Sequence, residues 1–221
     1  MRGIDRRSLL GAGVTALPGP LSAQSRTVPV QRFAAAGTGR GTLLLVYGSD
    51  GLTNPGRYRL AAQMLAGLGY TVLMPDYFQA TGDSRARYGE IRAKFPDWLA
   101  ALEGVLSTLP GGRIGIVGFS LGGALALALG ARDRRVAAVV DFFGFIPEGL
   151  ERAQRLAPTL ILHGAADRVV PVSNATAIER VLASRGVAVE VQIYPGEGHG
   201  LSAAAFPNAI ARIRDFLQRN L

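Results

Sequence analysis

One stretch in the middle of the chain, residues 113–130, constrains the fold most strongly: RIGIVGFSLGGALALALG. It opens as a short β-branched apolar run, typical of a buried parallel strand, and closes as an Ala/Leu run that favours a buried helix. Between them, Gly118 and Gly122 flank Ser120 in the pattern G-x-S-x-G. In a sharp strand-to-helix turn, larger residues at these two positions would collide with the backbone, and the positive end of the helix faces any anion formed at the hydroxyl. The stretch predicts a serine nucleophile; a glycine-rich turn with a bystander serine is the alternative.

The composition bounds the class of protein. The 221 residues fit one domain with a single buried core, and 48% hydrophobic residues with a mean hydropathy of +0.23 favour a globular fold. The chain has no cysteine, which excludes thiolate catalysis, disulfides and cysteine-ligated metal sites. A net charge of +8 would suit nucleic acid, but the basic residues are scattered and no nucleic-acid motif occurs. We therefore expect no nucleic-acid partner.

The first 23 residues have the organisation of an export signal. A basic start with Arg6 and Arg7 precedes an apolar run over residues 9–17, and small residues follow at Ser22 and Ala23. The run is shorter than the roughly 20 residues that span a bilayer, so no stable membrane insertion is expected. The arginine pair followed by Ser-Leu-Leu resembles a twin-arginine signal. We predict a signal peptide over 1–23, a mature domain over 24–221 and a periplasmic or extracellular location; a disordered or anchoring N-terminus is the alternative.

From there onward, patterns typical of strands alternate with patterns typical of helices. This alternation predicts an α/β fold: a doubly wound, mostly parallel sheet with helices on both faces and reactive groups at the carboxyl ends of the strands. Strands are expected at 27–33 (an edge strand), 42–47, 70–74, 114–117, 135–143, 159–163 and 187–194. Helices are expected at 57–68, 85–108, 124–129, 147–156, 174–184 and 203–221, with Pro96 breaking or kinking the second and Asp97 capping its second half.

A serine hydroxyl needs a base, and the chain offers two histidines. His163 ends a predicted strand, where its side chain is expected to pack between sheet and helix. His199 lies in a glycine-flanked loop after the last strand and is free to reach the serine. We favour His199 as the base, with His163 as the alternative.

The base in turn needs a carboxylate that fixes its tautomer. Asp167 follows the strand before the last one, and the chain order Ser120, Asp167, His199 agrees with that of α/β-hydrolases. Asp167 is therefore our candidate, although aspartates also cap helices and turns in such loops. Asp141, near the end of its strand, and Glu197, beside the histidine, are the alternatives.

Acyl chemistry also needs two backbone N–H donors for the oxyanion. One is expected from Leu121, directly after the nucleophile, and the other from the loop after strand 42–47, with Ser49 first and Asp50 next. Glycines at positions 48 and 51 let this loop approach a substrate closely. An ordinary glycine-rich turn is the alternative.

Five segments together resemble the dienelactone hydrolase family of α/β-hydrolases: YGSDGL (47–52), GYTVLMPDYF (69–78), GFSLGG (118–123), LHGAADRVVP (162–171) and YPGEGHG (194–200). They occur in the family's order and extend over essentially the whole mature chain. The resemblance implies the α/β-hydrolase fold, a triad of Ser120, His199 and Asp167, and neither a metal nor an organic cofactor.

The resemblance also bears on the substrate pocket. It places Tyr77 and Phe78 in the pocket lining, together with Asp50 of the oxyanion loop. Arg85 and Arg87, just downstream, either meet a substrate carboxylate or are exposed on a helix. The enzymes that named the family have a cysteine nucleophile and a glutamate at the position of Gly48, whereas this chain has a serine and no cysteine.

The sequence thus predicts an exported serine hydrolase that cleaves small-molecule esters or lactones through an acyl-serine intermediate. The segment between Phe143 and Thr159 is short, which indicates a minimal lid and favours a small or accessible substrate. Two alternatives remain: an acyltransferase that uses the same triad, and a binding protein that keeps the fold without catalysis.

Overall fold

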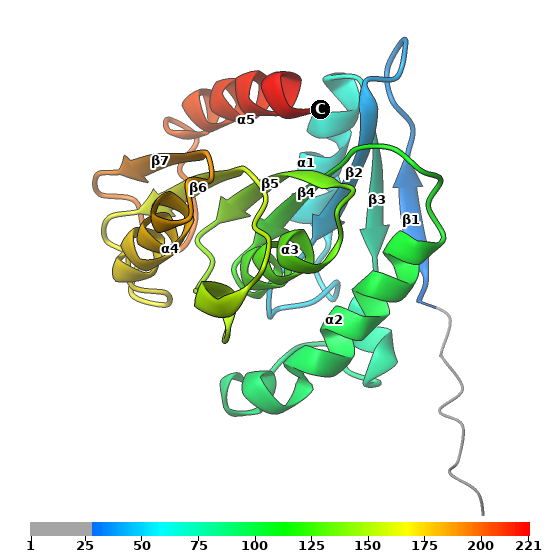
Figure 1. Cartoon of the computed structure of the whole chain (residues 1–221). Helices are drawn as coiled ribbons and strands as arrows, with labels where there is room; N and C mark the ends of the chain where they lie inside the picture. The colour runs from blue at the N-terminus through cyan, green and yellow to red at the C-terminus, as the bar shows by residue number, and fades with distance from the viewer. Residues whose placement is uncertain (1–27) are drawn as a thin grey trace, which may run out of the picture.

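The computed structural model describes residues 28–221 (Figure 1), and the predicted signal peptide lies outside them. Within them, seven strands form one sheet in the order β1-β3-β2-β4-β5-β6-β7. β1 pairs antiparallel with β3, and the other neighbours are parallel, so the predicted sheet and its edge strand are confirmed. The strands are β1 (Val30–Phe33), β2 (Gly41–Val46), β3 (Tyr70–Pro75), β4 (Ile114–Phe119), β5 (Val136–Phe142), β6 (Thr159–Gly164) and β7 (Val189–Tyr194).

Helices cover both faces of this sheet. Figure 1 shows α2 (Ile91–Ser107), α3 (Leu121–Arg132) and α4 (Ser173–Ser184) on one face, and α1 (Gly56–Gly67) and α5 (Phe206–Asn220) on the other. Because β2 and β4 lie inside the sheet with both faces covered, their sequences are almost continuously apolar. None of the helices in residues 28–221 is long and apolar enough to cross a membrane.

Two expectations about helices are corrected. α2 begins at Ile91, after a short 3₁₀ turn over Tyr88–Glu90, and not at residue 85 as expected. It runs through Pro96 as one helix, where we expected a break or a kink. Pro96 removes only one intrahelical hydrogen bond near the start of the helix, and the buried Trp98 and Leu99 that follow anchor the next turn. The helix expected over 147–156 is a single 3₁₀ turn, Leu150–Arg152, because Gly149 has a left-handed φ of 84° that an α-helix cannot contain.

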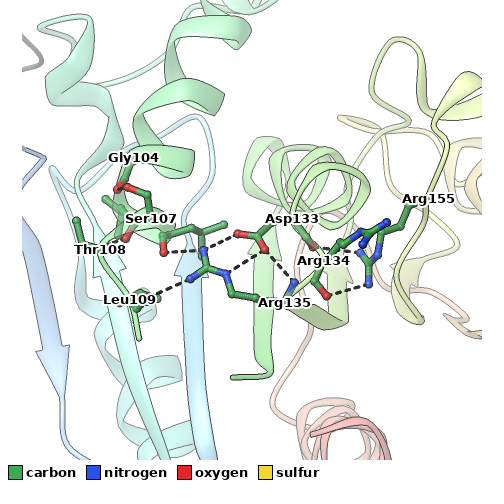
Figure 2. A network of polar contacts seen from close by, with 10 residues as sticks. Gly104, Ser107, Thr108, Leu109, Asp133, Arg134, Arg135 and Arg155 are labelled. Atoms are coloured by element: carbon green, nitrogen blue, oxygen red, sulfur yellow. Dashed lines mark hydrogen bonds and ion pairs between the residues drawn. The ribbon is translucent and has the colours of Figure 1, made fainter. Parts of the chain in front are cut away.

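Two arginines fix the ends of α2 and α3 that lie away from the carboxyl edge of the sheet (Figure 2). The Arg135 guanidinium donates to the carbonyls of Leu106 and Leu109 at the end of α2, and forms an ion pair with Asp133. Arg155 donates to the carbonyls of Gly130, Asp133 and Val136, around the end of α3 and the start of β5. Carbonyls at helix C-termini lack intrahelical partners and attract cations, so these contacts hold both helices in place.

Candidate active site

Ser120 stands on a tight turn between β4 and α3. Its φ of 56° and ψ of −116° are unusual for a residue with a side chain, and its amide donates to the Phe142 carbonyl at 2.7 Å. A Cβ at Gly118 would lie 2.2 Å from the Gly122 carbonyl oxygen, and one at Gly122 would lie 2.1 Å from the Val46 carbonyl oxygen. No side chain fits at either position, so the two glycines let the strand turn into the helix at once.

His199 and Asp167 come from the loops after β7 and β6. These strands are parallel neighbours, with Gly164 opposite Tyr194, so their loops leave the sheet side by side. His199 Nε2 lies 2.9 Å from Ser120 Oγ, although 79 positions separate them in the chain, and His199 Nδ1 lies 2.7 Å from Asp167 Oδ2. The structure therefore places a hydroxyl, an imidazole and a carboxylate in one line of hydrogen bonds.

The Asp167 carboxylate is held in its ionised form. Its side chain is fully buried, which opposes ionisation. The hydrogen bond with His199 and the amides of Val169 and Val170, which donate to Oδ1 at 2.8 and 2.9 Å, outweigh this effect and hold the pKa of the carboxyl below its usual range. The carboxylate is thus suited to orient the ring and to stabilise an imidazolium.

Among the described residues, neither the alternative base nor the alternative acids form a hydrogen bond with Ser120 or His199. His163 is fully buried, as expected, and its Nε2 lies 2.9 Å from the Val170 carbonyl oxygen. Glu197 accepts hydrogen bonds from the amide and hydroxyl of Ser202. Asp141 is fully buried, and its carboxyl oxygens have no hydrogen-bond partner among the described residues.

The candidate oxyanion donors also lie at Ser120. Leu121 begins α3, and both Leu121 and Ser49 line a cavity that includes Ser120. The loop of Ser49 is tied down by a residue that sequence reasoning missed: the Tyr58 hydroxyl accepts from the Gly48 amide at 2.9 Å and donates to Asp50 Oδ1 at 2.5 Å. Tyr58 lies on α1, ten residues further on, and its sequence context gives no signal of this contact.

The expected pocket residues are not where the resemblance placed them. Tyr77 and Phe78 are fully buried in a 3₁₀ turn, with the Tyr77 hydroxyl donating to the Tyr47 carbonyl, and neither lines a cavity that reaches Ser120. Asp50 is exposed and forms an ion pair with Arg57. Arg85 and Arg87 are exposed as well. These residues support the site from beneath or lie outside it.

Two cavities meet at Ser120. The larger, of about 860 Å³, includes Ser49 and Leu121 and extends between α2 and α3. The smaller, of about 310 Å³, includes His199 and extends between α1 and α5. Most of their lining is apolar, which suits an uncharged organic substrate whose reacting carbonyl lies at the serine.

The sheet order, with a serine on the turn after its central strand, is that of the α/β-hydrolase fold. Among solved structures, a monoacylglycerol lipase from Paleococcus ferrophilus shares this fold, with a TM-score of 0.70 and 17% identity over 88% of this chain and 99% of that one. The family model for the dienelactone hydrolase family matches residues 46–212, and the chain belongs to that family.

Curated relatives support the assignment. A carboxymethylenebutenolidase homolog from Xenopus tropicalis is 28% identical over 156 residues, which are 64% of this chain and 63% of the relative. Acyl-protein thioesterase 1 from Neurospora crassa is 31% identical over 124 residues, which are 52% of this chain and 49% of the relative. The chain thus spans less than two thirds of the length of these relatives.

Proposed function

We propose that this protein hydrolyses carboxylic esters or lactones through an acyl-serine intermediate. The observation that carries the proposal is the line of contacts from Ser120 Oγ to His199 at 2.9 Å and from His199 to Asp167 at 2.7 Å. Family membership and the hydrolytic names of the relatives support an ester or lactone as the substrate.

In this mechanism, Ser120 Oγ attacks the carbonyl carbon while His199 Nε2 takes the hydroxyl proton. Asp167 stabilises the imidazolium that results. The amides of Leu121 and Ser49 donate to the oxyanion of the tetrahedral intermediate. As the intermediate collapses, the imidazolium gives its proton to the leaving alkoxide, and the acyl group remains on the serine. Water, deprotonated by the same imidazole, then releases the carboxylic acid.

Two measurements on the purified protein test the proposal: labelling by a fluorophosphonate, and hydrolysis of 4-nitrophenyl acetate. We expect the wild type to be labelled at Ser120. Ser120→Ala is expected to abolish labelling and to lower kcat/KM by about 10³-fold or more. Ser184→Ala, an exposed serine on α4, serves as the matched control and should retain both signals. Full hydrolysis by Ser120→Ala would disprove the mechanism, and an unlabelled, inactive wild type would favour a binding protein.

We also propose export through the signal at residues 1–23. The support is the pair Arg6-Arg7 followed by a short apolar run. Replacing both arginines by lysine should keep the protein in the cytoplasm of a host with a twin-arginine pathway. N-terminal sequencing of exported wild-type protein gives the cleavage position, and unchanged export of the double variant would refute the assignment.

A further inference from the structure

The two cavities at Ser120 differ in which part of the machinery lines them. The larger one includes Ser49 and Leu121, the candidate oxyanion donors, and His199 is not in its lining. The smaller one includes His199, and neither oxyanion donor is in its lining. A substrate whose carbonyl lies at Ser120 therefore has two chemically different cavities available for the groups on either side of that carbonyl.

The direction of proton transfer indicates which part of the substrate each cavity binds. The oxygen that leaves the tetrahedral intermediate must lie beside His199 Nε2, because that atom delivers its proton. The oxyanion faces the amides of Leu121 and Ser49, and the leaving oxygen takes the side of the imidazole. The acyl chain, which is the remaining substituent of the reacting carbon, is then directed into the other cavity, whose lining includes these two donors. We propose that the larger cavity, here called the acyl groove, binds an extended apolar acyl chain and that the smaller one binds a compact apolar alcohol. This assignment rests on the proposed function.

The acyl groove has walls of the right chemistry for a hydrocarbon chain. Phe95 and Leu99 contribute from α2, and Phe145 and Ile146 from the segment after β5. Ala128 and Ala131, three residues apart and so on one face of α3, provide small half-buried side chains along its floor. Larger residues at these two positions would fill the space that the alanines leave.

The groove is long as well as apolar. Between Leu121, next to the nucleophile, and Ala131, α3 rises by roughly 15 Å, which matches an extended chain of about twelve carbon atoms. At the edge of the groove, Arg92 of α2 forms an ion pair with Glu148 of the segment after β5, with an N–O distance of 3.3 Å. This ion pair links the two sides of the groove. The short segment between Phe143 and Thr159 leaves this groove open, with a volume of about 860 Å³. This is more room than the small substrate expected from the sequence needs.

The first test is a chain-length series of 4-nitrophenyl esters with acetyl, butyryl, octanoyl and dodecanoyl groups. Full burial of one methylene can raise kcat/KM by about fourfold, and the octanoyl group has about six more methylenes than the acetyl group. Even partial burial of this chain in the groove should therefore make the octanoyl ester exceed the acetyl ester by about tenfold or more. Ala128→Leu should lower this octanoyl-to-acetyl ratio by about tenfold. Ala131→Leu, further along the floor, should act mainly on the dodecanoyl ester and provides a second variant.

Matched controls separate the two cavities. Ala61→Leu narrows the smaller cavity from α1, so it should lower the rate on 1-naphthyl acetate relative to methyl acetate while the acyl chain-length ratio stays as in the wild type. Ala183→Leu, exposed on α4, should change neither ratio. A flat chain-length series overturns the assignment, and so does an acyl preference that responds to Ala61→Leu in place of Ala128→Leu.

A binding measurement distinguishes failure of the groove from failure of the catalytic proposal. Ser120→Ala should bind the fluorescent fatty acid dansyl-undecanoic acid, and adding Ala128→Leu should weaken binding by about tenfold. If the wild type hydrolyses no ester but this difference holds, the groove stands and the proposed function falls. If the acetyl ester is cleaved but neither the ratio nor the binding responds to Ala128→Leu, the acyl groove is wrong and the proposed function stands.

Discussion

His163 Nε2 lies 3.4 Å from Asp167 Oδ2, the same oxygen that His199 Nδ1 contacts at 2.7 Å. Since a carbonyl only accepts, the contact of His163 Nε2 with the Val170 carbonyl places the proton on that nitrogen. Burial lowers the pKa of the His163 imidazole, so the ring is neutral. His163 thus holds the loop that carries the Asp167 carboxylate and acts as a positioning residue.

We expect His163→Leu to lower kcat by about tenfold with little change in KM, because the Val170 carbonyl loses its partner and the Asp167 carboxylate shifts. His163→Gln keeps an N–H donor at nearly the same place and should recover part of the loss. Steady-state kinetics of both variants, with thermal unfolding recorded alongside, provide the measurement. Equal kcat values for the leucine and glutamine variants would argue against a role for the N–H group.

Tyr58→Phe should impair the oxyanion loop. The change leaves the buried Gly48 amide without its acceptor and removes the hydrogen bond from Tyr58 to Asp50, which then keeps its ion pair with Arg57, so the Ser49 amide is held less firmly. We expect kcat/KM for 4-nitrophenyl acetate to fall by about tenfold, less than the loss of an oxyanion donor itself. Tyr70→Phe, a buried tyrosine at the start of β3, is the control. Equal activity of the two variants would remove Tyr58 from the account of this loop.

Asp141 should make the protein less stable as the pH rises. Burial raises the pKa of its carboxyl from 3.8 to about 7 in the folded protein. Between these values the unfolded chain releases the proton while the folded one keeps it, so the free energy of unfolding falls by up to roughly 4 kcal/mol across this interval. Asp141→Asn should remove this decline, as measured by urea unfolding at acidic and neutral pH.

Asp133→Asn is the control, because the pKa of the Asp133 carboxyl is shifted in the opposite direction to that of Asp141. The hydrogen bond from Arg135 holds the pKa of the Asp133 carboxyl below 3.8, so its contribution to stability is present above that pH and is lost on acidification. The wild type and Asp141→Asn should therefore converge at acidic pH and diverge at neutral pH, whereas Asp133→Asn should converge with the wild type only in strong acid. Parallel pH profiles for the wild type and Asp141→Asn would contradict a protonated Asp141.

Arg155→Ala should destabilise the fold without affecting the chemistry. Its guanidinium donates to three carbonyls around the end of α3, and the variant loses all three of these hydrogen bonds (Figure 2). We expect a loss of about 2 kcal/mol in the free energy of unfolding and an unchanged kcat. Arg134→Ala, an exposed neighbour, is the control and should stay within about 0.5 kcal/mol of the wild type. A loss of kcat without a loss of stability would contradict this purely structural role.

Local patterns predicted much of the scaffold and the three side chains that form the line of contacts at Ser120. The strand–turn–helix around Ser120 is encoded within 18 positions by periodicity and two glycines, and no other residues are needed to recognise it. His199 could be selected because the chain has two histidines and the other one, His163, ends β6, a strand that is buried on both faces. Short-range information suffices for such features.

Features that depend on packing between distant elements were missed or wrong. The acyl groove forms where α2, α3 and the segment after β5 come together, and none of these segments indicates it alone. The family resemblance placed Tyr77 and Phe78 in the pocket lining, but the 3₁₀ turn directs them into the interior. Tyr58 reaches Gly48 only because α1 packs back across the loop. Each of these depends on side-chain direction after folding.

The left-handed backbone at Ser120 has a consequence for the whole molecule. A φ of 56° with a ψ of −116° disfavours every residue with a Cβ and costs of the order of 1–3 kcal/mol, whereas glycine adopts it freely. Ser120→Gly should therefore yield an inert protein that melts at a higher temperature than the wild type. Under the proposed function, a selection for thermostability alone would therefore remove the hydroxyl on which turnover depends.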